Sequence, residues 1–296
     1  MIRAGSEEIT LATEEATPMS GGLWQSGVPG AERELPQLDI SVAHIARVYN
    51  YWLGGKDNYA ADREAGDETL QGYPDMLSSV RANRAFLRRT VRYLAVEAGI
   101  RQFLDIGTGL PSADNTHEVA QAVAPQSRVV YVDNDPVVLA HARALLTSGP
   151  EGVTGYLDAD ARDVGTILAE AGKLLDFSQP VGVMLVAILQ FIEDTDDPYR
   201  LVARLIEAVP PGSFVVVSHP PSDMQRLAPG LAQALAKLSK TMAQRVTPRS
   251  REQVTRFFDG VDLIEPGVVP IQQWRPDSDA EAAARAGMWG GVGRKP

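Results

Sequence analysis

Phe103-Leu104-Asp105-Ile106-Gly107-Thr108-Gly109-Leu110-Pro111 is the stretch that decides the fold of this 296-residue chain. It starts as a short apolar run and ends in a turn with two glycines, which allow a tight turn and a close approach of a ligand to the backbone. Asn115 follows, and Glu118 stands three residues later, the spacing of a pair that caps a helix N-terminus. The stretch therefore predicts a strand, a ligand-binding turn and a helix in succession.

Apolar runs recur after this stretch and predict a parallel sheet. Further strands are expected at 129–132, 155–157, 181–186 and 214–217. Helical patterns separate them at 116–123, 136–146, 164–171 and 199–209. Apolar strands that alternate with helices form a parallel sheet covered on both faces. Two last runs, 262–264 and 288–294, fit an antiparallel pair at one edge. We predict an α/β fold with a Rossmann-like, seven-stranded, mostly parallel sheet and helices on both faces.

The chain before the sheet divides into two parts of different composition. Residues 1–38 contain Gly, Pro, Ser and Glu without periodicity, which predicts a flexible tail. Residues 39–99 carry helical patterns, beginning with an apolar stripe at helical spacing over 45–52. We predict a helical lid or cap over 39–99 and the sheet domain over 100–296.

Bulk composition disfavours several classes of function. The absence of cysteine excludes disulfides, thiolate nucleophiles and cysteine-bound zinc, and it agrees with a cytoplasmic location. No apolar run reaches the roughly 20 residues of a membrane helix. The net charge of −10 disfavours non-specific binding to nucleic acid or an anionic membrane. We expect a cytoplasmic protein without a metal site, a nucleic-acid partner or a membrane partner, and we leave a homo-oligomer open.

Carboxylates near the glycine-rich turn narrow the kind of ligand. Asp105 stands two residues before the first glycine, where it would repel a diphosphate and attract an α-amino group. A dinucleotide turn needs a third glycine where this chain has Ser112, and no Gly-Lys-Ser/Thr follows for a P-loop. The turn therefore favours the zwitterionic part of an amino acid over a diphosphate.

The ends of the next two strands favour a nucleoside. Asp133 closes the second strand, where a carboxylate can accept hydrogen bonds from both hydroxyls of a ribose. Asp135 is expected to cap the following helix instead. After the third strand, either Asp158 or Asp160 could accept the exocyclic amine of adenine, and we favour Asp160.

With these three turns in register, residues 103–220 resemble the class I S-adenosylmethionine-dependent methyltransferases. Longer strings at 41–59, 103–117 and the terminal Gly-Val-Gly-Arg-Lys-Pro are similar to a bacterial S-adenosyl methyltransferase family once described as a domain of unknown function. The resemblance implies S-adenosyl-L-methionine as cofactor. It implies that the methionine part meets Asp105, Gly107 and Gly109, the ribose meets Asp133, and the adenine meets Asp160 and Ala161. Asn134, next to Asp133, is also expected to bind the cofactor.

The resemblance implies no methyl acceptor. Some methyltransferases with amine acceptors carry Asn-Pro-Pro-Tyr after the fourth strand, whereas this chain has Ala187-Ile188-Leu189-Gln190. We therefore expect a small-molecule acceptor rather than a nucleobase or a glutamine. The alternatives are a protein that binds the cofactor for regulation or as a scaffold without turnover, and an NAD-dependent oxidoreductase, which Asp105 and Ser112 disfavour.

Three histidines are candidates for a general base, which helps only if the acceptor has a proton to lose. His219 follows the fifth strand at the edge where ligands bind, His117 lies in the first turn after the glycine-rich loop, and His44 shares a polar helix face with Arg47 and Tyr51. A lone histidine is also compatible with a structural role, and His141 is predicted to be a surface residue.

The segment from His44 to Tyr59 is predicted to act as a lid over the methionine end of the cofactor. Closure would align the acceptor and exclude water. Tyr49, Tyr51 and Asp57 are the expected wall residues of the acceptor pocket. The alternative is a helix that packs on the sheet and never meets ligand.

Overall fold

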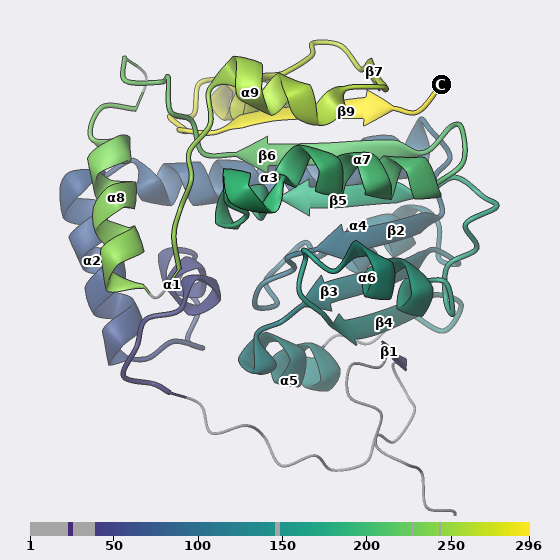
Figure 1. Cartoon of the computed structure of the whole chain (residues 1–296), viewed down its shortest axis with the longest axis horizontal. Helices are drawn as coiled ribbons and strands as arrows, with labels where there is room; N and C mark the ends of the chain where they lie inside the picture. Colours follow the sequence, from purple (N-terminus) through teal and green to yellow (C-terminus); the bar gives the residue numbers. More distant parts are fainter. Residues whose placement is uncertain (1–22, 26–38, 146–148, 227, 243) are drawn as a thin grey trace, which may run out of the picture.

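A nine-stranded mixed sheet forms the centre of the molecule in the computed structural model, which describes residues 23–25, 39–145, 149–226, 228–242 and 244–296 (Figure 1). The strands are β1 (Leu23–Gln25), β2 (Gln102–Ile106), β3 (Arg128–Asp133), β4 (Val153–Asp158), β5 (Gly182–Val186), β6 (Phe214–His219), β7 (Asp262–Leu263), β8 (Val269–Pro270) and β9 (Trp289–Arg294). The helices are α1 (Ile45–Trp52), α2 (Ala60–Gly72), α3 (Met76–Val96), α4 (Thr116–Val123), α5 (Pro136–Leu145), α6 (Val164–Ala171), α7 (Pro198–Ala208), α8 (Leu231–Thr241), α9 (Arg251–Thr255) and α10 (Asp279–Ala282).

The strand order is β1-β4-β3-β2-β5-β6-β9-β7, with β8 paired to β9. Strands β2 to β6 run parallel, and β9 enters antiparallel between β6 and β7. All seven predicted strands are present. Two more strands are added, β8 and β1, and β1 pairs antiparallel with β4 where the sequence predicted no regular structure. The rest of the predicted tail, residues 1–22 and 26–38, lies outside the described residues.

The order of the strands places a ligand crevice. Chain order reverses at β2, which has β3 on one side and β5 on the other. In open parallel sheets ligands bind beyond the carboxyl ends of the strands at such a reversal. In Figure 1 the parallel strands point toward the side of the molecule where α1, α2 and α8 lie. The predicted cap over 39–99 stays a prediction; two of its three helices, α1 and α2, lie at this edge.

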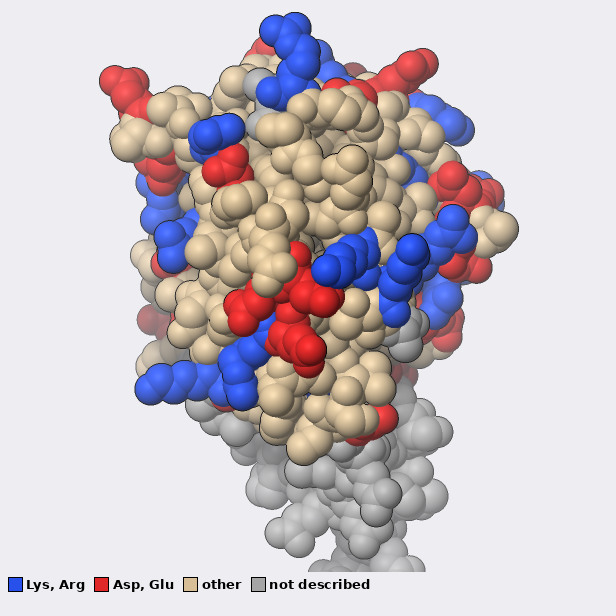
Figure 2. Space-filling model, turned by 90° about the vertical axis from the view of Figure 1, so that its left-hand side faces the viewer, with Lys and Arg blue, Asp and Glu red and all other residues tan. Residues whose placement is uncertain are grey.

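The outer side of α2 and α8 carries charges of both signs. Figure 2 shows this side of the molecule, where basic and acidic side chains are interspersed. One ion pair joins the two helices, with Lys237 Nζ 3.4 Å from Glu68. Because the two side chains are 56% and 36% exposed, the pair contributes little to stability.

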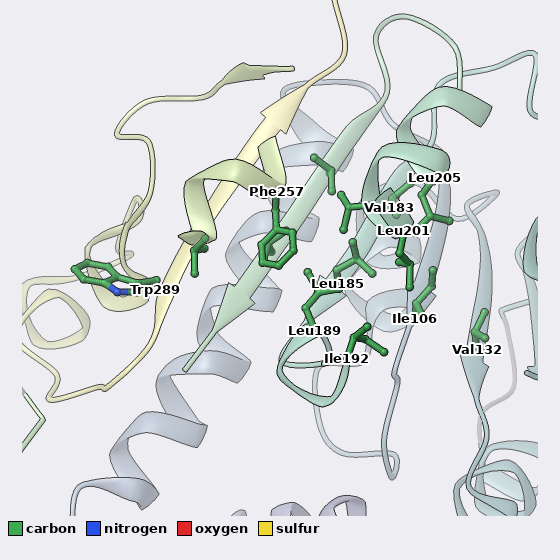
Figure 3. Close-up of a cluster of buried hydrophobic side chains, with 14 of the residues drawn as sticks. Ile106, Val132, Val183, Leu185, Leu189, Ile192, Leu201, Leu205, Phe257 and Trp289 are labelled. Carbon is green, nitrogen blue, oxygen red and sulfur yellow. The ribbon is translucent and has the colours of Figure 1, made fainter. Parts of the chain in front are cut away.

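Alternate residues of the strands face two separate cores. Leu104 and Ile106 of β2 face one core, which includes the buried residues of α6 and α7, and Phe103 faces the other, which includes those of α3 and α4. Figure 3 shows the first core, where Leu201 and Leu205 of α7 lie over β5. Burying a leucine side chain stabilises a fold by roughly 1.5–3 kcal/mol. The two cores hold the ends of the parallel strands in fixed positions.

The basic face of α3 is covered by the C-terminal part of the chain. Arg89 is 3% exposed, and it donates hydrogen bonds to the carbonyls of Ile271 (2.7 Å) and Trp274 (3.1 Å) and to Glu281 (2.8 Å). Its charge is therefore neutralised within the fold. No helix in the described ranges is long and apolar enough to cross a membrane.

Candidate functional site

A cavity opens at the carboxyl ends of β2, β3, β5 and β6, beneath α1, α3 and α8. A second, smaller cavity adjoins it beyond β3 and β4. The two share several lining residues, which are Gly107, Asp133, Asn134, Ile188, Phe191 and Gln244. We call the larger one the main cavity and the smaller one the side cavity. Together they follow the strand ends across the point where chain order reverses.

Asp105 supplies a buried carboxylate to the main cavity. It is 5% exposed, and Thr116 Oγ1 donates a hydrogen bond to its Oδ2 at 2.6 Å. Burial raises the pKa of Asp105 to about 6. A cationic group beside it would offset this cost, because opposite charges favour the ionised form. The residue therefore fits an α-ammonium group, as the sequence predicted.

Glycine is required at the two positions of the turn for different structural reasons. Gly107 has φ +77° and a Cβ there would lie 2.5 Å from the side chain of Ile188. Gly109 has φ +66° with open space beside it. A side chain at 107 would clash as well as strain the backbone, whereas one at 109 would mainly strain the backbone. Both line the main cavity, so the predicted turn lies where a ligand can reach its backbone.

Asp133 lies between the two cavities and lines both. Its Oδ2 accepts a hydrogen bond from Gly109 N and its Oδ1 accepts one from Asp135 N, each at 2.9 Å. Burial raises the pKa of this carboxyl group. Each oxygen retains a free acceptor position, which suits a pair of ribose hydroxyls. Asn134 is exposed beside it and lines both cavities.

Asp160 and Ala161 line the side cavity, whereas Asp158 does not. Arg162 donates to Asp160 Oδ1 from its backbone N (2.8 Å) and Nε (2.9 Å), and to Oδ2 from Nη2 (2.6 Å). The hydrogen bonds from Arg162 lower the pKa of Asp160. The choice of Asp160 over Asp158 as the adenine contact therefore fits the geometry, and it stays a prediction.

Arg84 belongs to the site although the sequence did not single it out. It extends from α3 to the main cavity, where its Nη2 donates to the carbonyls of Ala113 and Asp114, both at 2.9 Å. Its Nε is buried without a hydrogen-bond partner among the described residues. Its positive charge acts on Asp105 and favours the ionised carboxylate. Arg84 and Asp105 thus offer opposite charges to a zwitterion.

Two of the three candidate histidines lie away from both cavities. His219 is fully buried, with Nδ1 2.9 Å from Pro220 O and Nε2 3.0 Å from Arg249 Nη1. Burial lowers the pKa of His219 to about 3. Since a carbonyl accepts and an arginine donates, both ring nitrogens are occupied in the neutral form. His219 therefore has no access to an acceptor, contrary to the prediction that it could serve as a base.

His117 is also enclosed. It is 4% exposed, and its backbone N and its Nδ1 lie 2.8 and 2.9 Å from Tyr131 Oη. Burial lowers the pKa of His117. The residue lines neither cavity, so its contacts support a structural role at the start of α4.

His44 is the one of the three candidates that lines the main cavity. It precedes α1, and its Nδ1 lies 2.7 Å from Asp135 Oδ2. The side chain of His44 is 39% exposed and that of Asp135 is 3% exposed. Asp135 Oδ1 also accepts from Val137 N at 2.8 Å, so the predicted helix cap is present as well.

The three predicted wall residues separate into one that lines the cavity and two that do not. Tyr49 lines the main cavity, where its Oη accepts from Asn83 Nδ2 at 3.1 Å and donates to Val80 O at 3.2 Å. Tyr51 turns away and donates to Asp67 Oδ1 at 2.7 Å on the exposed side of α2. Asp57 pairs with His141 of α5 at 3.2 Å, outside both cavities. Contrary to the prediction, neither Tyr51 nor Asp57 lines a cavity, because Tyr51 lies on the face of α1 that is turned toward α2 and Asp57 lies in the loop after α1, beside α5.

Part of the lining of the main cavity is apolar. This part comes from three helices, α1, α3 and α8. The lining residues include Ile45, Trp52, Val80, Leu87, Leu231 and Leu235. We call this part the acceptor chamber.

A family model described as S-adenosyl methyltransferase matches residues 31–296, which is most of the chain. The chain belongs to this family. Its cofactor is S-adenosylmethionine, and the predicted cofactor and fold are confirmed. No curated protein matches the chain.

Two solved structures support membership in the S-adenosyl methyltransferase family. A DUF574 family protein from Streptomyces avermitilis is 43% identical, with a TM-score of 0.83, over 87% of this chain and 99% of that one. A protein from Thermobifida fusca is 40% identical, with a TM-score of 0.79, over 88% of this chain and 97% of that one. The chain is thus similar to both proteins over nearly their whole length.

Proposed function

We propose that this methyltransferase transfers the methyl group of S-adenosylmethionine to a small, largely apolar molecule bound in the acceptor chamber. The observation that carries the proposal is the chamber itself. Apolar side chains of three helices line the same cavity as the charged turn at Asp105. Small-molecule sites are mostly apolar, with a few polar groups that fix orientation.

The residues around the strand ends fit the cofactor part by part. Asp105 and Arg84 would hold its ammonium and carboxylate groups, because they offer one charge of each sign. Asp133 would accept the ribose hydroxyls, and the side cavity at Asp160 would take the adenine. When bound, the cofactor supplies a sulfonium methyl carbon that is open to attack in line with the carbon–sulfur bond.

A series of buried hydrogen bonds holds the wall of the acceptor chamber in place. Ser218 Oγ at the end of β6 donates to Asn83 Oδ1 at 2.7 Å, and Asn83 Nδ2 donates to Tyr49 Oη. These hydrogen bonds connect α1 to α3 and α3 to the sheet. A fixed wall favours methyl transfer, because the reaction depends on aligning the acceptor and excluding water.

A protein that only binds the cofactor is the alternative function. Such a protein needs the charged turn and the side cavity, but it does not need the apolar acceptor chamber. The acceptor chamber therefore favours an enzyme over a binding module.

Turnover of candidate acceptors tests the proposal. Release of S-adenosylhomocysteine would be measured with phenols, catechols, aromatic amines and fatty acids, and with RNA and a peptide mixture as macromolecular controls. We expect turnover within the small apolar set and none with the macromolecules. Methylation of RNA or peptide alone would overturn the small-molecule assignment. Tight binding of S-adenosylmethionine without any turnover would favour the binding module.

A further inference from the structure

His44 and Asp135 form a pair at the boundary of the main cavity. They come from segments far apart in sequence, the start of α1 and the turn between β3 and α5. Asp135 is nearly inaccessible to solvent, while more than a third of the His44 side chain is exposed. A buried carboxylate therefore holds a histidine that is open to the cavity.

The contacts of His44 bear on the tautomer of its imidazole. His44 Nδ1 lies 2.7 Å from Asp135 Oδ2, and a carboxylate only accepts hydrogen bonds, so this contact favours a proton on Nδ1. Ala46 N donates to the same Nδ1 at 3.4 Å, which favours the other tautomer but over a longer distance. Burial opposes ionisation of Asp135, but the contacts with His44, Val137 and Arg47 together outweigh it, and the pKa of Asp135 is lowered. The shorter contact therefore favours neutral His44 with its proton on Nδ1 and a free lone pair on Nε2.

Other proton acceptors at the main cavity are already occupied. Asp105 and Asp133 are assigned to charged or hydroxyl groups of the cofactor, and Tyr49 Oη is engaged by Asn83 and Val80. By contrast, His44 Nε2 has no hydrogen-bond partner among the residues that the structure describes.

We propose that His44 is the general base for the methyl acceptor and that Asp135 positions it. This inference rests on the proposed function, and it narrows the acceptor to a molecule with a hydroxyl or N–H proton to lose. The oxygen or nitrogen of the acceptor bonds to the methyl carbon, and the carbon–sulfur bond breaks with its electron pair going to sulfur. The released proton passes to His44 Nε2 and then to solvent at the exposed edge of the ring.

Four charged groups surround His44. Asp135 binds its ring, Asp133 lies close enough to interact with its charge, and Asp62 of α2 accepts from its backbone N at 2.9 Å. Arg47 of α1 is the opposing cation, and its charge is shared with Asp62 through a contact of 3.0 Å. Of these four groups, Asp135 is the one in direct contact with the imidazole ring.

Nitrogen NMR on histidine-labelled protein tests the pair without any acceptor. The chain has four histidines, and His44→Gln assigns the His44 signal. We expect neutral His44 to carry its proton on Nδ1, and Asp135→Asn to change the chemical shift of Nδ1, because it removes the carboxylate beside it. A proton on Nε2, or the same His44 signals in both proteins, would overturn the pair.

Kinetics then tests the catalytic role, with 1-naphthol and tryptamine as acceptor probes. His44→Gln and Asp135→Asn should each lower kcat by about a hundredfold or more and remove the acidic limb of the pH profile. Binding of S-adenosylhomocysteine to His44→Gln should change less than about threefold. His141→Gln is the matched control, since it breaks an exposed His–Asp pair outside both cavities and should keep its kcat.

The outcomes separate the two proposals. Loss of S-adenosylhomocysteine binding in parallel with kcat would show that His44 holds the cofactor rather than a proton, and full activity in His44→Gln would remove it as a base. If neither probe is methylated by the unmodified protein, the acceptor class is wrong, and the NMR experiment still decides whether the pair exists. Circular dichroism of each variant checks that α1 and the fold are retained.

Discussion

The cofactor end of the cavity and the acceptor chamber differ in chemistry and in origin. The cofactor end collects charged residues from successive strand ends, namely Asp105, Asp133 and Asp160, with Arg84 added from α3. The acceptor chamber is built from apolar faces of α1 and α3, which precede β2 in sequence, and of α8, which follows β6. The first region suits one defined charged ligand, whereas the second selects mainly by shape and apolar area.

The two regions also differ in how much they reduce the stability of the fold. Buried Asp105 has a pKa of about 6 in place of 3.8, a cost on the order of 3 kcal/mol when it is ionised. The chamber carries no comparable cost, because its apolar walls also belong to the core. A variant that removes the charge of Asp105 should therefore weaken cofactor binding and raise the stability of the fold.

Asp105→Asn should produce the largest change in cofactor binding. It removes the carboxylate that faces the ammonium group, and a hydrogen bond to a charged group contributes about 1.5–3 kcal/mol. We expect affinity for S-adenosylmethionine to fall about 10- to 100-fold by calorimetry. In the unmodified protein the affinity should also fall as the pH drops below about 6, because Asp105 becomes protonated. A pH-independent affinity between pH 5 and pH 8 would contradict this role.

The same variant should be more stable than the unmodified protein in the absence of ligand. With a raised pKa, folded Asp105 holds its proton between pH 3.8 and about 6 while the unfolded chain has released it. The unfolding free energy therefore declines as pH rises through this window and stays lower above it. Thermal melts at pH 7 should show a higher Tm for Asp105→Asn, and the gain should shrink toward pH 4. A lower Tm at pH 7 would show that the bond from Thr116 outweighs desolvation.

Asp133→Ala should weaken cofactor binding by about tenfold or more, because it removes an acceptor for two ribose hydroxyls. Asp135→Ala should weaken binding less, since its carboxylate bonds Val137 N and His44 instead. Calorimetry with S-adenosylhomocysteine compares the two. The reverse order of effects would place the ribose at Asp135.

Ala46→Phe tests the acceptor chamber separately from the cofactor end. Ala46 lies on α1, is half-buried and lines the main cavity, so a larger side chain takes space from the acceptor. We expect KM for the acceptor to rise about tenfold, while the Kd of S-adenosylhomocysteine stays within about twofold. Ala46→Ser is the matched control and should change neither value. A loss of cofactor affinity in Ala46→Phe would show that α1 touches the cofactor directly.

The smallest expected effect concerns the lid. The loop at Gly54-Gly55 follows α1, and Asn50 ties it down by accepting from Asp57 N at 3.1 Å. Cofactor should slow proteolysis near Gly54-Gly55 a few-fold, since a bound ligand favours the closed arrangement. Equal cleavage with and without cofactor would leave α1 as a packing helix.

The cofactor end could be predicted from the sequence because its rules are local. A turn with two glycines in positive φ, an acid two residues earlier and acids at the next strand ends are all set within a few residues. Parallel strands bring their carboxyl ends to one edge, so Asp105, Asp133 and Asp160 meet there without any knowledge of packing.

Local rules failed where the site depends on the direction of a side chain or on a contact between segments distant in sequence. His219 stands at a strand end as predicted, but its side chain points away from the cavity and stacks on Phe257, with the ring centroids 6.0 Å apart. Arg84 carried no sequence signal that set it apart from the other arginines of α3. The pairing of His44 with Asp135 joins residues whose proximity depends on how α1 docks.

The sequence by itself determined the sheet, the glycine-rich turn and the carboxylates at the strand ends, because spacing along the chain fixes each of these, and it indicated the cofactor through its resemblance to a methyltransferase family. Only the tertiary structure decided which faces of α1 and α3 turn inward, and therefore which histidine is accessible and what encloses the acceptor chamber. The physical reason is that an amphipathic helix has a predictable apolar stripe, but its partner and its rotation are set by packing against segments elsewhere in the chain.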